Sequence, residues 1–186
     1  MSDVPERWTQ ARVYPDMWTD PDQDPRNSDG VSPDGELATL RDYVRGYRLT
    51  LLMKCEGMTP GQLARRSVPP STLSLLGLVR HLAECERGWR AWIHPASPEP
   101  PLYGAGDAAF DDAKGEQALV EHAFADLDRE QSATDDLLAS YPDLSTRVGQ
   151  KGIAIREIWV HRIEEYARHC GHADLLRERI DGRVGQ

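Results

Sequence analysis

The stretch AIREIWVHRIEEYARHCGHADLLRERI, residues 154–180, decides the fold. Its apolar side chains recur at spacings of three and four residues, which is the period of an amphipathic helix. We therefore expect one long helix from about Ala154 to Ile180, and Gly182 is placed to end it. The apolar side chains that carry this period are Ile155, Trp159, Ile163 and Tyr166.

Two earlier segments show the same period. Asp34 can cap the N-terminus of a first helix, which we expect to end at Gly57. Either Ser71 or Thr72 is expected to cap the next helix, and the pair His94-Pro95 to end it, because proline cannot continue a helix. Both segments are long enough to form sides of a bundle.

A third helix is expected over residues 120–141, where the side chains of one helix face, from Val120 to Tyr141, recur at alternating spacings of four and three residues. A shorter helix is expected from Thr59-Pro60 through about Arg66. Residues 95–113 contain several prolines and residues 143–152 two glycines, so both are expected to be loops. Because no stretch alternates as a strand does, we predict an all-α protein, a four-helix bundle.

The bundle is expected to span residues 34–182, between an extended leader and a short tail. The leader, residues 1–33, is rich in proline and aspartate, and the tail comprises residues 183–186. Several side chains of the leader are too apolar for a solvated segment, so we expect them to dock on the body or on a second subunit, as in a homodimer. They are Trp8, Tyr14, Met17 and Trp18.

The acidic charge of the chain lies mainly at its start. The formal net charge is −9, and residues 1–36 account for −6 of it, with nine acidic and three basic residues. An acidic chain lacks the basic surface that binds phosphates, which argues against nucleic acid and against electrostatic attachment to a membrane. Because the bundle itself is nearly neutral, its charge does not exclude small anionic molecules as ligands.

The spacing of the cysteines and the absence of a visible secretion signal both indicate the cellular compartment of the protein. The 3 cysteines are widely spaced and form no Cys-x-x-Cys motif, so reduced thiols are expected. No apolar run of about 20 residues predicts a membrane-spanning helix, and no secretion signal is visible. These features predict a cytoplasmic protein.

Four polar side chains form a stripe on the last helix: His161, Glu165, His169 and His172. At the rotation of an α-helix they lie within about 80° of one another. An imidazole and a carboxylate one turn apart can bind a divalent ion from one helix face. His81, beside an apolar seam on its own helix, is the natural third ligand, and Cys85 follows one turn later. A hydrogen-bond network or a solvated face would also explain the stripe.

Two blocks of sequence resemble the DinB-like superfamily, and within it the branch of mini-circle proteins. The first block, residues 70–89, contains Val-Arg-His81-Leu-Ala-Glu-Cys85-Glu-Arg-Gly-Trp89, and the second, residues 164–178, contains Glu165-Tyr-Ala-Arg-His169-Cys-Gly-His172. The resemblance covers roughly residues 34–182. It implies a four-helix bundle that holds a divalent metal with His81, Glu165 and His169.

The glutamate in that ligand set departs from the all-histidine form of the superfamily. Mycothiol-dependent maleylpyruvate isomerases resemble this chain in having glutamate at that place. Zinc is the expected metal, with nickel or iron as alternatives, and a low-molecular-weight thiol is the implied cofactor. His172 or His161 is expected to move a proton.

The resemblance implies a metal-dependent thiol S-transferase of the mycothiol type, or a related detoxification enzyme acting on a small molecule. Isomerase activity is less expected, because the chain has no counterpart of the additional domain of the isomerases, and hydrolase activity is also less expected. Two alternatives remain at this point. One is a non-catalytic bundle that binds a metal or ligand, and the other is a structural or dimerisation module without metal.

Overall fold

The computed structural model describes residues 4–12, 18–27, 32–96 and 98–185. Four long helices make up the body, which confirms the all-α prediction. They are α1 (Glu36–Cys55), α3 (Leu75–Ile93), α5 (Gln117–Ala139) and α6 (Ile155–Asp181). Three short helices accompany them: η1 (Pro21–Gln23), α2 (Pro60–Leu63) and α4 (Ala108–Asp111).

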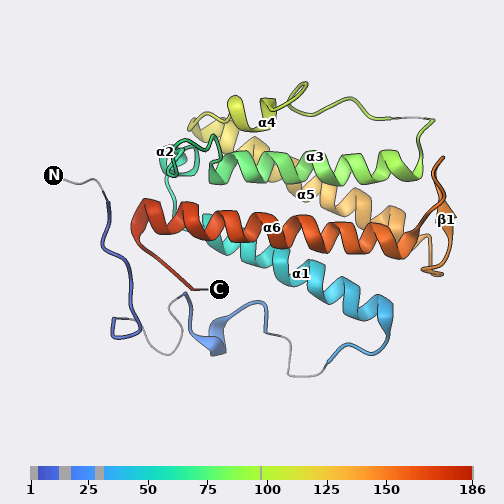
Figure 1. Ribbon diagram of the computed structural model, residues 1–186, viewed down its shortest axis with the longest axis horizontal. Helices are drawn as coiled ribbons and strands as arrows, with labels where there is room; N and C mark the ends of the chain where they lie inside the picture. The colour runs from blue at the N-terminus through green and yellow to red at the C-terminus, as the bar shows by residue number, and fades with distance from the viewer. Residues whose placement is uncertain (1–3, 13–17, 28–31, 97, 186) are drawn as a thin grey trace.

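The long helices pack as two pairs, α1 with α6 and α3 with α5. The pairs meet where α3 and α6 run side by side in opposite directions (Figure 1). Their shared interior contains aliphatic side chains from all four helices, such as Leu51, Leu78, Leu127 and Ile158. Burial of these side chains supplies the main favourable free energy of folding. This meeting of α3 and α6 positions the candidate site.

Three predicted helix starts differ from the structure, and one of them is that of α5, which begins at Gln117 rather than at Val120. The first helix begins after Gly35 rather than after Asp34. In α3 the expected caps Ser71 and Thr72 are three and two residues early, because Ser74 Oγ accepts the backbone N–H of Gly77 at 3.1 Å. A serine in the extended conformation ahead of a helix satisfies a backbone donor that the helix leaves free.

The expectation of no strand is wrong over residues 143–152 and just after them. Strand β1 (Arg147–Val148) pairs antiparallel with β2 (Ile153–Ala154), and Arg147 lies opposite Ala154. Gly149 and Gly152 have positive φ, which allows the chain to turn back within a few residues. Strands of two residues are too short to produce an alternating pattern. The segment 95–113, expected to be a loop, also contains the single helical turn α4.

The interior contains charged side chains as well as aliphatic ones. The Glu86 carboxylate of α3 is fully buried, and it accepts hydrogen bonds from Arg48 of α1 and Tyr166 of α6, both at 2.9 Å. Arg162, also fully buried, lies 3.4 Å from the same carboxylate. A carboxylate buried without such partners would strongly destabilise the fold. Glu86 therefore links three of the four long helices.

The leader follows the side of the bundle formed by α1 and α6 (Figure 1). Trp18 is only 2% exposed, and its ring lies against the cationic groups of Lys54, Arg177 and Arg183. The Trp8 backbone N–H also donates to the carbonyl of Gly182 at 2.9 Å. These two tryptophans contact the body, as expected from their apolar character. Tyr14 and Met17 lie outside the described residues.

Candidate metal centre

Antiparallel packing of α3 and α6 brings two polar pairs face to face. His81 and Cys85 lie one turn apart on α3, and Glu165 and His169 lie one turn apart on α6. His81 Nε2 is 3.2 Å from Glu165 Oε1, and His169 Nε2 is 3.3 Å from the same oxygen. Two imidazoles and one carboxylate therefore converge between the two helices.

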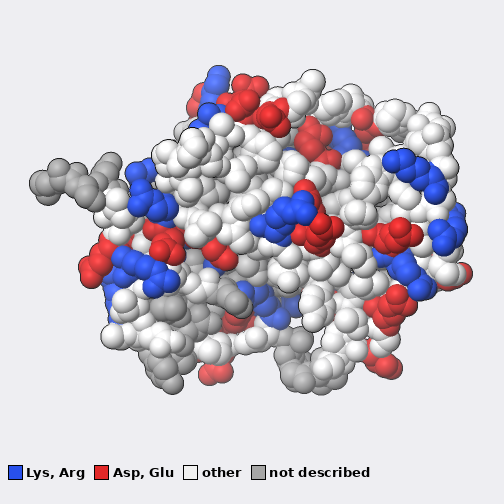
Figure 2. Space-filling view, in the orientation of Figure 1, with Lys and Arg blue, Asp and Glu red and all other residues white. Residues whose placement is uncertain are grey.

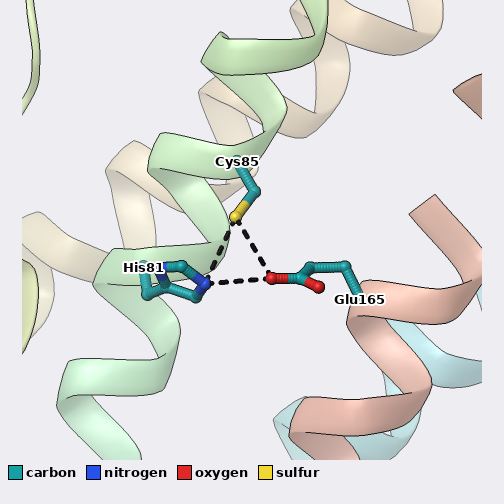
Figure 3. Close-up of side chains that lie close together, drawn as sticks. All are labelled: His81, Cys85 and Glu165. Carbon is teal, nitrogen blue, oxygen red and sulfur yellow. Dashed lines mark hydrogen bonds and ion pairs between the residues drawn. The ribbon is translucent and has the colours of Figure 1, made fainter. Parts of the chain in front are cut away.

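Cys85 completes this cluster from the α3 side (Figure 3). Its Sγ lies 3.4 Å from His81 Nε2 and 3.9 Å from Glu165 Oε1. The potential ligand atoms of His81, Cys85 and Glu165 all lie within 4.8 Å of one another. We use the term α3–α6 cluster for these three residues together with His169.

Three separations in the α3–α6 cluster are close to those between ligands of one tetrahedral ion: Glu165 Oε1 to each imidazole Nε2, and Cys85 Sγ to His81 Nε2. Zinc bonds of 2.0–2.3 Å imply nitrogen and oxygen ligands about 3.3 Å apart, and sulfur about 3.6 Å from nitrogen. The distances from Glu165 Oε1 to the two imidazoles, 3.2 and 3.3 Å, agree with the first value. They also suit hydrogen bonds between an imidazole N–H and a carboxylate, so the geometry accommodates a cation or a proton.

Burial favours the ligand-competent form of His169. Desolvation and the neighbouring His81 lower the pKa of His169 to about 4, against the opposing pull of Glu165. Desolvation alone would raise the pKa of Glu165, but the hydrogen bond with His81 and the nearby positive charge, including Arg168, lower it. A neutral imidazole and an ionised carboxylate are the forms that bind cations.

The side chains around the cluster hold its members in place. His172 Nδ1 lies 3.2 Å from His169 Nδ1, so one of these nitrogens donates to the other and fixes the His169 ring. Arg168 donates to Glu165 Oε2 at 3.0 Å. The ring of Phe110, in α4, lies 5.0 Å from that of His81. Phe110 was missed by the sequence analysis, because no periodic pattern marks it within the expected loop.

The predicted polar stripe on α6 divides into two parts. Glu165, His169 and His172 are joined by the contacts above, whereas His161 packs its ring against Trp92 of α3 at 5.3 Å. These two rings line a pocket of about 330 Å³ together with Lys151 of the β1–β2 turn. His161 therefore belongs to a neighbouring pocket, and the structure does not bring it into the α3–α6 cluster.

The cluster is reachable from solvent. The side chains of His81 and Glu165 are 26% and 22% exposed. On the face seen in Figure 2, acidic and basic side chains are interspersed and no extended patch of one sign is seen. Small molecules of either charge can approach the cluster without strong general repulsion.

Among the residues that the structure describes, no helix is long and apolar enough to cross a membrane.

Comparison with known proteins agrees with the resemblance noted in the sequence. A search of curated proteins finds no match to the chain. The family model for mycothiol-S-transferase matches residues 39–182, which include all four long helices apart from the first turn of α1. The match confirms the DinB-like resemblance. The chain belongs to the mycothiol-S-transferase family.

Proposed function

We propose that the protein is a divalent-metal-dependent S-transferase that transfers a low-molecular-weight thiol of the mycothiol type to an electrophile. Membership of the mycothiol-S-transferase family supports the thiol and the transfer. The metal dependence rests on one observation. His81 and His169 both lie within hydrogen-bonding distance of the same carboxylate oxygen, Glu165 Oε1.

The donor set favours zinc. Two imidazoles and one carboxylate form the protein ligands of known catalytic zinc sites, which keep a further position open. A bound cation would stabilise the thiolate form of the substrate thiol, which is the nucleophilic form. Nickel and iron also accept imidazole and carboxylate ligands, so metal analysis has to separate the three.

The neighbouring residues have positioning roles in this proposal. Arg168 holds Glu165 through Oε2, which leaves Oε1 directed at both imidazoles. His172 holds the His169 ring through the hydrogen bond between their Nδ1 atoms, and we assign His172 as the first candidate for moving the proton of the substrate thiol. His161, one turn from Glu165 on the exposed side of α6, is the second candidate for proton transfer.

We assign the pocket beside Trp92 and His161 to the substrate. Trp92 is 42% exposed, although it is a large aromatic side chain, and it lines this pocket of about 330 Å³. Trp92 follows Cys85 by seven residues on α3, a rise of about 10 Å along the helix. If the sulfur of a substrate thiol is held at the cluster, the rest of the molecule can reach the pocket beside Trp92.

A conjugation assay with matched histidine variants tests the proposed function. The protein, loaded with zinc, is incubated with mycothiol and an electrophilic aryl halide, and conjugate formation is followed. We expect metal-dependent turnover that His81→Ala and His169→Ala abolish. His94→Ala is the control, because His94 is an exposed histidine at the end of the same α3 helix as His81. Metal-loaded protein that forms no conjugate with any of a panel of electrophiles would refute the transferase.

A further inference from the structure

We propose that Cys85 is a fourth, exchangeable ligand of this centre, and that it occupies the position which the substrate thiol must take. The inference rests on the proposed metal-dependent function and concerns how the same centre is kept closed until a thiol arrives. It assigns a role to a side chain that the proposed transfer reaction does not itself require.

The placement of Cys85 supports this role. Its Sγ lies 3.4 Å from His81 Nε2, close to the separation of about 3.6 Å expected between sulfur and nitrogen ligands of one zinc ion. Its distance to Glu165 Oε1 is 3.9 Å, so a sulfur bond of about 2.3 Å to the same ion requires only a small adjustment. Figure 3 shows Cys85 and His81 directed at Glu165 from the same helix.

The other two cysteines provide the contrast. Cys170 is buried, and its thiol donates to the backbone carbonyl of Tyr47 at 3.4 Å. Cys55 is buried at the end of α1 as part of the apolar core. Of the three thiols, Cys85 is the one whose sulfur lies among potential ligand atoms in the described structure.

A fourth protein ligand changes how the centre operates. Four protein ligands are typical of closed zinc sites, and three with an open position are typical of catalytic ones. Cys85 is tethered one turn from His81, so its effective concentration at the ion is of millimolar order or above. An incoming thiol therefore has to compete with an internal thiolate, and only a thiol at comparable concentration or with further contacts displaces it.

The exchange balances without any oxidant or reductant. The sulfur of the incoming thiol takes the place of Cys85 Sγ, and the proton that this thiol loses is taken up by the Cys85 thiolate. One metal–sulfur bond forms and one breaks, and the net charge of the centre stays the same. The released Cys85 thiol can then donate to Glu165 Oε1, the acceptor that lies 3.9 Å from it.

Cobalt substitution of the full-length chain tests the inference, because a sulfur ligand gives bound Co²⁺ a near-ultraviolet charge-transfer band. We expect the wild-type protein with Co²⁺ alone to show this band, and Cys85→Ser and Cys85→Val to bind Co²⁺ without it. Loss of a ligand should weaken Co²⁺ binding at least about tenfold, the lower end of the effect seen for supporting residues. Cys170→Ser is the control and should keep the band, since a serine hydroxyl can also donate to the Tyr47 carbonyl.

Thiol titration separates exchange from a merely structural cysteine. N-acetylcysteine added to Co²⁺-loaded Cys85→Val should create the band, and at a lower concentration than is needed to alter the spectrum of the wild type. Stoichiometric Co²⁺ in the wild type without a sulfur band would overturn the inference and leave the proposed function standing. A band that persists in both Cys85 variants would also overturn it. If Co²⁺ does not bind at all, the proposed metal dependence itself fails.

Discussion

The Glu130 carboxylate of α5 gives a quantitative test of the charged interior. It is 1% exposed and accepts hydrogen bonds from Arg87 at 2.8 Å and from Arg90, both on α3. Desolvation would raise the pKa of Glu130, but the hydrogen bonds from Arg87, Arg90 and Arg129 outweigh it and lower the pKa from 4.5 to about 2. At about 1.4 kcal/mol per pH unit, this difference corresponds to about 3 kcal/mol of stability.

The sign of the pH dependence follows from the lowered pKa. A carboxylate that is ionised more easily in the folded state stabilises it above the unfolded pKa of 4.5, and the contribution is lost as the pH falls toward about 2. Glu130→Gln, which resembles the protonated side chain, should therefore lower the free energy of unfolding by about 3 kcal/mol at pH 7. At pH 3 the same linkage leaves a difference of only about 1.4 kcal/mol.

Urea unfolding at pH 7 and pH 3, followed by circular dichroism, measures both differences. Glu121→Gln is the matched control, because Glu121 is an exposed glutamate of the same helix, and it should change stability by less than about 0.5 kcal/mol. A Glu130→Gln difference that is the same at both pH values would refute the assigned electrostatic origin. So would a difference below about 1 kcal/mol at pH 7.

Three further predictions concern the leader, the hairpin and the substrate pocket. Trp18→Ala removes a ring that is 2% exposed, so thermal unfolding should show a loss of about 3–5 kcal/mol; an unchanged melting temperature would contradict the docking of the leader. Gly149→Ala should also lower the melting temperature, because φ is +66° and a Cβ would collide with the carbonyl oxygen of Trp92. Trp92→Ala should raise KM for the thiol several-fold with metal content unchanged, and a KM equal to that of the wild type would remove Trp92 from the proposed pocket.

The helices could be predicted because each has an apolar period and boundary residues. The period in residues 154–180 placed α6 to within a residue of its observed bounds, Ile155–Asp181. The start of α3 was misplaced because Ser71, Thr72 and Ser74 are all suitable caps, and only the folded backbone selects Ser74. The β1–β2 pair could not be predicted, since two residues per strand carry no measurable alternation.

The α6 part of the candidate site was predictable from spacing, whereas His81 on α3 was expected from the apolar seam beside it and from the family resemblance, and it does meet Glu165. Spacing on α6 placed Glu165, His169 and His172 on one face, and these three are connected in the structure. The same spacing included His161, whose ring instead turns to Trp92, because a helix face of about 80° is wide enough to serve two neighbouring pockets. Which residue of α3 meets Glu165 depends on how the two helices pack, and sequence spacing alone does not determine that.

The most direct test of the metal centre is anomalous diffraction from crystals grown with zinc. We expect a strong anomalous peak between α3 and α6, within about 2.0–2.3 Å of His81 Nε2, Glu165 Oε1 and His169 Nε2. If the centre is empty in crystals that bind zinc elsewhere, with Glu165 hydrogen-bonded to both histidines, the cluster is a hydrogen-bond network and the proposed metal-dependent chemistry is wrong.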